Sequence, residues 1–308
     1  MRRQFYSHGK LLITGEYVVL DGALALAVPT KYGQSLEVET INEKEIQWTA
    51  LDHEGKEWFK TALIFNGKDL ELAKTTTSPA EAEQRLLQIL KEAHKLNPGI
   101  LIQDSGFNIA TKLDFPQSWG LGSSSTLINN IAQWFEIDPY VLLRNTFGGS
   151  GYDIAVAQNE HPVTYQLTQE TRSILLTNFD PDFKDQLFFV HLNRKQDSRA
   201  SISHYREQSG ENKSATIEKI SALTRQFISC ESLEEFKLLM EIHETLISKI
   251  IQTPKIKTSL FSDFPGAIKS LGGWGGDFIL ATGGKMERDY FRKKGYDTVV
   301  LYSEMVKQ

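Results

Sequence analysis

Short apolar runs separated by turn residues dominate the first half of the chain. Residues 10–28 predict two strands around a turn at Asp21-Gly22, because runs rich in Leu, Ile and Val flank this Asp-Gly pair. The same pattern predicts further strands at 35–41, 45–51 and 106–113. The first half of the chain therefore has the pattern of a sheet.

Residues 78–96 have the pattern of an amphipathic helix. Ser78 suits the cap, Pro79 suits the first helical position, and Glu81 follows three residues after the cap. The apolar positions then fall mostly on one face: Leu86, Leu87, Ile89 and Leu90. We expect a helix over this segment.

The pattern changes after Asn193, where long helical stretches replace short strands. Before it we expect helices at 123–135 and 138–147 and strands at 162–167, 173–179 and 186–193. After it we expect helices at 199–208, 213–229, 231–251 and 263–270, and a β-α-β ending over 276–302. Strands and helices mix without regular alternation, which indicates an α+β fold. We place an N-terminal domain at 1–172 and a C-terminal domain at 173–308.

Composition fits this division and narrows the function. A chain of 308 residues with 40% hydrophobic residues is long for one core, so two domains are expected. The 34 basic and 39 acidic residues give a net charge of −5 without any run of like charges. Nucleic-acid binding needs a basic face, so we expect no nucleic-acid partner.

Two further features bear on location. Cys230 is the single cysteine and can form no internal disulfide, which fits a reducing cytoplasm. The first 28 residues begin with two arginines and turn apolar, but His8, Lys10, Glu16 and Asp21 interrupt the apolar part. We therefore expect neither a signal peptide nor a membrane span.

The segment "SWGLGSSSTLINN", residues 118–130, is the first candidate for chemistry. Glycines allow close approach of backbone N–H groups to a ligand, and the first turn of a helix offers unpaired N–H groups and a positive dipole end. Such a helix start binds anions, and serine hydroxyls there can bond phosphate or hold Mg²⁺. The alternative is a serine-capped helix after a glycine turn. No Walker A sequence occurs in the chain.

Three other segments are ambiguous when taken singly. In "GGSGYDIAVA", Asp153 could accept a proton from a substrate hydroxyl or cap a helix. In "SLGGWGGDFILAT", residues 270–282, the glycines could simply let two elements pack closely. In "HGKLLITGEYVVLDG", Lys10 at a strand end could be a solvated edge residue.

The four segments together, in this order, resemble the motifs of the GHMP kinases, the small-molecule kinases named for galactokinase, homoserine kinase, mevalonate kinase and phosphomevalonate kinase. The first motif is matched by "GKLLITGEYVVLDGALALAVPT" and the phosphate loop by "GLGSSS". The catalytic-acid segment is matched by "GSGYDIAVA" and the third motif by "GGWGGDFILAT". The resemblance implies an N-terminal domain that binds nucleotide and is similar to the second domain of ribosomal protein S5, and a ferredoxin-like C-terminal domain.

The resemblance also implies roles for single residues. Asp153 would orient the substrate hydroxyl and take its proton, and Lys10 would offset negative charge. The cofactors would be ATP and Mg²⁺, with Ser124 as a metal ligand. The nucleotide phosphates would lie on Gly120, Leu121, Gly122, Ser123, Ser124 and Ser125. Substrate contacts would come from Glu16, Ser150, Gly151, Gly275, Gly276 and Asp277.

The acceptor implied by the resemblance is phosphomevalonate or mevalonate, in isoprenoid precursor synthesis. The "GEY" at 15–17 and the "GSGYD" segment resemble phosphomevalonate kinases, whereas Trp274 stands where the family has a small residue, usually glycine. Two alternatives stay open: an enzyme similar to diphosphomevalonate decarboxylase, or a catalytically silent ligand-binding relative. Arg194, Lys195 and Arg199 either meet a phosphate or carboxylate or are surface charges.

Overall fold

The structure is a computed structural model that describes residues 2–67, 69–73, 80–102, 105–169, 171–196, 198–208 and 213–307, without the side chains of Ala80, Ser198 and Arg199. The chain forms two compact units. Unit 1 consists of Met1–Gly9, Tyr32–Gln117 and Gly122–Gln158, and unit 2 of Lys10–Lys31, Ser118–Leu121 and Asn159–Gln308. The expected domain division after residue 172 stays a prediction.

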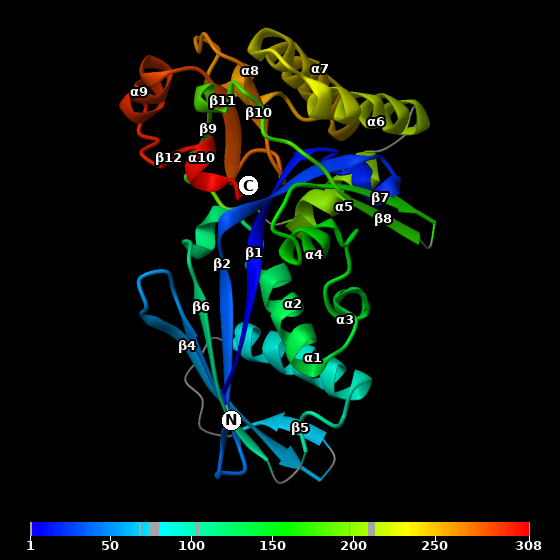
Figure 1. The fold of residues 1–308 in the computed structure, drawn as a ribbon, viewed down its shortest axis with the longest axis vertical. Coiled ribbons are helices and arrows are strands. Elements are labelled where there is room, and N and C mark those ends of the chain that lie inside the picture. Colours follow the sequence, from blue (N-terminus) through cyan, green and yellow to red (C-terminus); the bar gives the residue numbers. More distant parts are fainter. Residues whose placement is uncertain are drawn as a thin grey trace. The chain divides into compact units, whose positions relative to one another are not determined.

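Unit 1 packs helices on a sheet (Figure 1). The second part of β2 (Ala25–Ile41) pairs antiparallel with β6 (Gly106–Leu113), which lies parallel to β3 (Ile46–Leu51). β4 (Glu57–Asn66) and β5 (Asp69–Leu72) complete this edge. Alternate residues of β3 are buried because successive side chains of a strand point to opposite faces. The helices of the unit are α1 (Ala80–Leu96), α2 (Ser123–Phe135), α3 (Pro139–Thr146) and α4 (Tyr152–Ala157).

Unit 2 contains two groups of strands. The last part of β1 (Arg2–Thr14) and the first part of β2 belong to this unit. The first part of β2 pairs with β7 (Val163–Thr168), which in turn pairs with β8 (Thr171–Leu176). The second group is an antiparallel sheet in the order β10-β11-β9-β12. Its strands are β9 (Leu187–His191), β10 (Ile268–Ser270), β11 (Phe278–Thr282) and β12 (Val299–Leu301).

The helices of unit 2 complete a ferredoxin-like arrangement. α6 (Lys213–Ser229) and α7 (Leu233–Ile251) lie between β9 and β10 in the chain, and α9 (Lys285–Lys293) lies between β11 and β12. This is the β-α-β-β-α-β order expected for the C-terminal domain. The likeness of the N-terminal domain to ribosomal protein S5 stays a prediction. The remaining helices are α5 (Ser198–Gln208), α8 (Ile256–Leu260) and α10 (Tyr302–Met305).

Most elements expected from the sequence are present. The strand at 106–113 and the helices at 123–135 and 213–229 have the expected bounds. The two strands expected within 10–28 are parts of the longer β1 and β2, and the short helix η1 (Val18–Asp21) lies between them. Ser78 and Pro79, the expected start of α1, lie outside the described residues.

One expected element is wrong. The segment 263–270 is not a helix: it ends in the strand β10, which pairs with β11 from Ile268 to Ser270. Pro265 and Gly266 interrupt it, and a Cβ on Gly266 would lie 2.2 Å from the carbonyl oxygen of Thr282. The close approach of the β11 end therefore requires glycine at this position.

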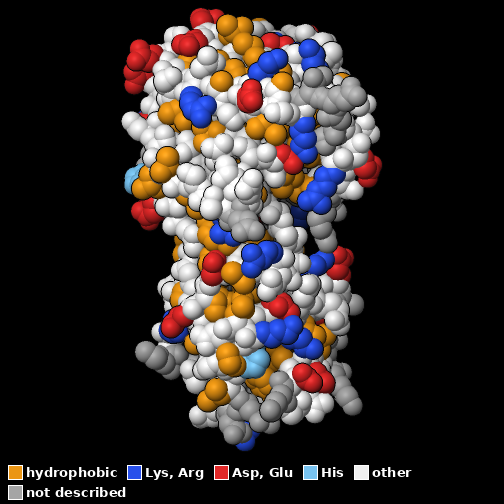
Figure 2. Space-filling model, turned by 90° about the vertical axis from the view of Figure 1, so that its right-hand side faces the viewer, with side chains coloured by type: hydrophobic (Ala, Val, Ile, Leu, Met, Phe, Trp, Pro, Cys, Tyr) orange, Lys and Arg blue, Asp and Glu red, His pale blue; other side chains and the backbone are white. Residues whose placement is uncertain are grey.

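Two observations concern nucleic acid and membranes as partners: the distribution of charge on the surface and the length and polarity of the helices. On the face shown in Figure 2, Lys and Arg side chains lie among acidic and apolar ones. Within the part of the chain that the structure describes, no helix is both long enough and apolar enough to cross a membrane.

Candidate phosphate-binding site

The segment expected to be the phosphate loop, Gly120–Ser125, runs directly into α2. Gly122 stands at the cap position with φ of 91°, and its carbonyl oxygen accepts the first helical bond, from the N–H of Thr126. No side chain caps this helix, so the alternative of a serine-capped helix is wrong. Because the first N–H groups of a helix have no intrahelical acceptor, Ser123, Ser124 and Ser125 present backbone donors at its start.

The serine and threonine hydroxyls at the start of α2 differ in their environment. Ser125 is buried, and its hydroxyl donates to the carbonyl oxygen of Gly122 at 2.9 Å. The buried Thr126 hydroxyl donates to Oε1 of Gln34 at 2.7 Å. Ser124 is exposed. Ser125 and Thr126 therefore build the loop, whereas Ser124 faces outward.

Lys10 of β1 holds the first part of the phosphate loop within unit 2. Its backbone N–H donates to the carbonyl oxygen of Leu121 at 2.9 Å, and its Nζ donates to the carbonyl oxygen of Gly120 at 3.2 Å. Leu121 is fully buried and anchors the loop from inside. The structure thus brings the first-motif lysine and the phosphate loop together.

Asp277 packs against the same end of the loop. A Cβ on Gly120 would lie 2.3 Å from Cγ of Asp277, so the carboxyl group occupies the space beside the glycine. Burial raises the pKa of Asp277, while the N–H of Gln196 and the charge of Lys10 oppose this rise. The charge of Lys195 lowers the pKa of Asp277 in the same way as the charge of Lys10 does.

His191, which sequence reasoning missed, contacts the segment that leads into the loop. His191 of β9 accepts the N–H of Asn193 at Nδ1, so its Nε2–H donates to the carbonyl oxygen of Ser118. The Trp119 ring meets Phe278 edge-on at 5.4 Å. The apolar run before His191 predicted the strand, but no local signal marked the histidine as a loop contact.

Asp153 lies in the first turn of α4, within unit 1. Gly151, with φ of 87°, occupies the cap position, so Asp153 is not the cap. The Asp153 carboxylate accepts the N–H of Ile154 at 3.1 Å, and its side chain is half-buried. Ser150 is buried beside this turn. The positions of these residues do not test the catalytic and substrate roles expected for them.

The third glycine segment, Leu271–Asp277, packs against residues that follow β9. A Cβ on Gly276 would lie 2.6 Å from Cγ of Gln196 and 2.9 Å from the carbonyl oxygen of Arg194. Gly275 has φ of 91°. Arg194 and Lys195 have exposed side chains, and the side chain of Arg199 lies outside the described residues.

Trp274 is buried within this segment. Its backbone N–H donates to the hydroxyl of Tyr17 at 3.0 Å, and its backbone carbonyl oxygen accepts from Nε2 of Gln196. The side chain is 5% exposed, and its Nε1 has no hydrogen-bond partner among the described residues. The indole ring is thus part of the packed interior of unit 2.

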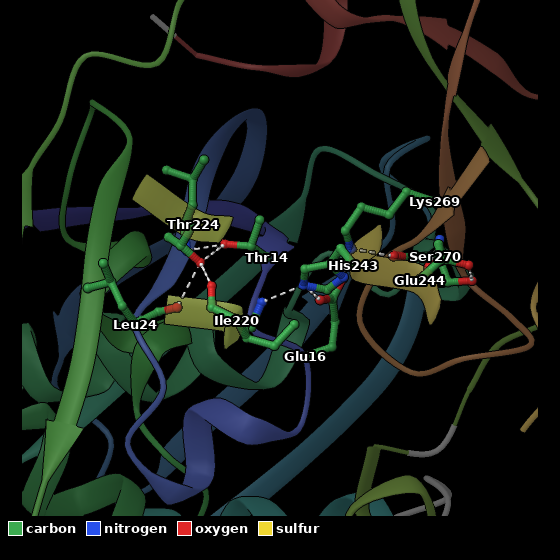
Figure 3. Close-up of polar contacts among 11 residues, drawn as sticks. Thr14, Glu16, Leu24, Ile220, Thr224, His243, Glu244, Lys269 and Ser270 are labelled. Atoms are coloured by element: carbon green, nitrogen blue, oxygen red, sulfur yellow. Dashed lines mark hydrogen bonds and ion pairs between the residues drawn. The ribbon is translucent and has the colours of Figure 1, made fainter. Parts of the chain in front are cut away.

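Glu16, expected to contact substrate, is also buried. It is 1% exposed, with Oε1 paired to Nζ of Lys269 and Oε2 3.3 Å from Nε2 of His243 (Figure 3). The sequence offered no signal for the burial of Lys269 and none for its pairing with Glu16.

No ready-made metal cluster exists among the described residues: no three or more His, Cys, Asp or Glu side chains are arranged to hold an ion. Magnesium in phosphate chemistry keeps several waters and takes one or two protein ligands besides phosphate oxygens. The exposed Ser124 fits that limited role for an ion that arrives with a nucleotide.

Comparison with solved structures identifies the fold. A Streptococcus pneumoniae phosphomevalonate kinase, solved with phosphomevalonate and AMPPNP, is 17% identical with a TM-score of 0.68, covering 97% of this chain and 98% of the other. A Methanococcus jannaschii mevalonate kinase is 16% identical with a TM-score of 0.66, covering 97% and 96%. A Lactococcus lactis galactokinase, solved with galactose, is 11% identical with a TM-score of 0.64, covering 100% and 95%.

The chain therefore has the GHMP kinase fold, as the resemblance implied. No protein-family model matches it, and no curated protein matches it in sequence. Mevalonate, phosphomevalonate and galactose kinases share this fold, so the fold alone does not select an acceptor.

Proposed function

We propose that the chain is a member of the GHMP kinase family, a cytoplasmic ATP-dependent enzyme that phosphorylates phosphomevalonate or mevalonate in isoprenoid precursor synthesis. The observation that carries the proposal is the phosphate loop. It leads from a segment held by Lys10 into the N-terminus of a 13-residue helix, within a fold shared with small-molecule kinases. A helix start with unpaired N–H groups suits the phosphates of a nucleotide.

Phosphoryl transfer asks mainly for positioning and for neutralisation of charge. In the proposed reaction the acceptor hydroxyl oxygen forms a bond to the γ-phosphorus of ATP, the bond from that phosphorus to the β,γ-bridging oxygen breaks, and ADP leaves. Asp153 orients the hydroxyl and takes its proton. Lys10 offsets negative charge.

Magnesium enters this proposal as part of Mg-ATP. When bound, the ion neutralises charge on the phosphate oxygens. Ser124 is the protein residue proposed to hold it, and Ser123 and Ser125 contribute backbone N–H groups to the phosphates. Gly120, Leu121 and Gly122 let the loop backbone approach the phosphates.

The acceptor side of the proposal rests on Ser150, Gly151, Gly275, Gly276 and Asp277. We favour phosphomevalonate because Gly15-Glu16-Tyr17 and the "GSGYD" segment are similar to that branch, as is the Gly275-Gly276-Asp277 sequence. A basic environment also suits a phosphorylated acceptor. The charges of Lys10 and Lys195 lower the pKa of the Asp277 carboxyl group, so both lysines lie near this proposed acceptor contact.

The test is Mg²⁺-dependent release of ADP from ATP, measured with mevalonate and with phosphomevalonate for the wild type and Asp153→Asn. We expect release with one acceptor and its loss in the variant. Asp138→Asn is the matched control, because it makes the same chemical change at a residue that caps α3 and has no proposed catalytic role. Absence of release with both acceptors contradicts the pathway assignment. Full activity in Asp153→Asn contradicts its catalytic role.

Nucleotide binding can be tested without an acceptor. A ligand that binds only the native state raises the midpoint of thermal unfolding. We therefore expect Mg-ATP to stabilise the protein more than ATP with excess chelator does. An unchanged midpoint at millimolar Mg-ATP contradicts the proposed nucleotide site.

A further inference from the structure

A fully buried ion pair joins the first motif to the strand that leads into the third glycine segment. Lys269 of β10 is 0% exposed and Glu16 is 1% exposed. Besides Glu16, Nζ of Lys269 reaches the carbonyl oxygen of Ser270 at 2.9 Å. A buried ion pair is a costly way to gain stability, since well-packed apolar residues often serve as well. Stability alone therefore does not explain why this ion pair lies beside a predicted ligand-binding segment.

The surrounding groups leave Lys269 and Glu16 as partners. His243 accepts the N–H of Gly15 at Nε2, and burial, with the charge of Lys269, lowers its pKa well below the ordinary value. Burial raises the pKa of Glu244 to about 8, and this carboxyl group accepts the N–H of Ser270 at 2.9 Å. At neutral pH His243 and Glu244 are thus uncharged. Burial also raises the pKa of Glu16, but the charge of Lys269 and its hydrogen bond oppose this rise, so Glu16 is the counter-ion of Lys269 (Figure 3).

The ion pair closes a ring of contacts within unit 2. Lys10 bonds the carbonyl oxygen of Gly120, and Gly120 packs against Asp277. Asp277 ends the glycine segment whose preceding strand carries Lys269, and Lys269 pairs with Glu16, six residues after Lys10. We call these five residues the contact ring. Lys10 and the third glycine segment are thus connected twice, once through Gly120 and Asp277 and once through the Glu16–Lys269 ion pair.

A second contact reinforces the same connection. The hydroxyl of Tyr17, the residue after Glu16, accepts the N–H of Trp274 in the middle of the segment. Tyr17 has φ of 63°, an uncommon conformation for a residue with a side chain, which persists only where the surroundings hold it. Its ring packs against Tyr205 of α5 at 5.6 Å. The turn after β1 therefore holds the glycine segment at its start and at its middle.

We propose that the buried Glu16–Lys269 ion pair is a positioning element of the reaction: it holds the third glycine segment so that Asp277 and Lys10 keep their places at the phosphate loop. Glu16 then acts on catalysis through Lys269, without touching substrate, which agrees with its burial. Glycine-rich segments lose much conformational freedom when ordered, so they need such external contacts. This inference rests on the proposed kinase function.

The test replaces the pair by neutral residues of similar shape, in the variant Glu16→Gln/Lys269→Met. Replacement of both partners avoids an uncompensated buried charge, so the fold is expected to persist, with a melting temperature near that of the wild type. Tyr302→Phe is the matched control. It removes another buried contact of unit 2, from the Tyr302 hydroxyl to the carbonyl oxygen of Phe179, outside the contact ring.

Amide hydrogen exchange and steady-state kinetics are measured on all three proteins. In the double variant we expect the amides of Trp274 and Asp277 to exchange about tenfold faster or more, while those of β9 keep their rates. We also expect kcat to fall by about ten- to a hundredfold, the effect of a small misplacement, with a smaller change in KM. The control is expected to keep both properties.

Two outcomes overturn the proposal: unchanged exchange at Trp274 and Asp277 in a folded double variant, or faster exchange with unchanged kcat. A wild type that transfers no phosphate contradicts the proposed function instead. In that case the exchange measurement still decides whether the ion pair holds the glycine segment, so the two failures are distinguishable.

Discussion

The carboxyl group of Asp277 lies directly against the backbone of Gly120. A Cβ built on Gly120 would lie 2.3 Å from Cγ and 2.5 Å from Oδ2 of Asp277, and Gly120 has φ of 66°. These two residues belong to the third glycine segment and the phosphate loop, which are far apart in the sequence. Their contact is the reason why position 120 requires glycine, for space as well as for conformation.

Gly120→Ala is therefore expected to displace either the loop or Asp277. The left-handed conformation alone costs an alanine about 1 kcal/mol, and the clash adds to this cost. We expect a fall in the free energy of unfolding, measured in urea, together with weaker binding of Mg-ATP, measured by titration calorimetry.

Gly67→Ala is the control for this change. Gly67 has φ of 63° and nothing within 4 Å of a built Cβ, so it shares the conformational cost without the clash. A Gly120→Ala variant that is no less stable than Gly67→Ala and binds Mg-ATP normally would show that the contact with Asp277 has no consequence.

Glu244 gives a prediction about pH. Burial raises the pKa of this carboxyl group to about 8, whereas its ordinary value is 4.5. The native state thus keeps a proton that the unfolded state loses, so the free energy of unfolding falls as pH rises from 4.5 to 8. The fall is about 1.4 kcal/mol per pH unit from this group, and it ends above pH 8.

Glu244→Gln removes this dependence, because an amide resembles the neutral carboxyl group and does not titrate. The groups that act on Glu244, namely Lys269, Glu16 and the backbone N–H and hydroxyl of Ser270, remain in the variant. We expect the wild type to lose stability relative to the variant between pH 5 and pH 8 in urea denaturation. Parallel stability profiles would contradict the raised pKa.

Local patterns explain why much of the fold could be predicted. The helix from Ser123 and the strand at 106–113 have regular periodicity and clear turn residues at their ends. The expected helix at 263–270 failed because its last three residues form a strand only through pairing with β11. Such a short strand depends on a partner, which no local window contains.

The candidate site divides in the same way. The phosphate loop could be predicted because glycine, serine and a helical pattern adjoin in one segment. The Glu16–Lys269 pair could not, because its members are 253 residues apart and each has the sequence context of an ordinary charged residue. The contacts of the Trp274 backbone were likewise unpredictable, since their partners Tyr17 and Gln196 are far from Trp274 in the sequence.

Ser124 and Ser125 offer a matched pair of variants in the phosphate loop. Ser125→Ala removes a buried hydrogen bond to Gly122 and is expected to lower the free energy of unfolding by about 1 kcal/mol. Ser124→Ala changes an exposed side chain, so its stability is expected to stay within about 0.5 kcal/mol.

In steady-state kinetics we expect the larger effect in Ser124→Ala, whereas in stability the larger effect is expected in Ser125→Ala. Loss of one hydroxyl contact to a charged ligand corresponds to about a tenfold rise of KM for Mg-ATP in Ser124→Ala. We expect a smaller change in Ser125→Ala, whose hydroxyl is already used within the loop. The reverse order of KM values would contradict the proposed role of Ser124.

The last prediction concerns the contribution of the buried Trp274 ring to stability. The ring is buried, but its Nε1–H has no partner among the described residues. An unsatisfied buried donor costs about 1–3 kcal/mol, so Trp274→Phe removes a cost while leaving a small cavity, and we expect a net change within about 1 kcal/mol. Trp274→Ala removes the whole ring and is expected to cost about 3–5 kcal/mol. Urea denaturation of both variants measures the contrast, and a loss in Trp274→Phe as large as that in Trp274→Ala would contradict the prediction.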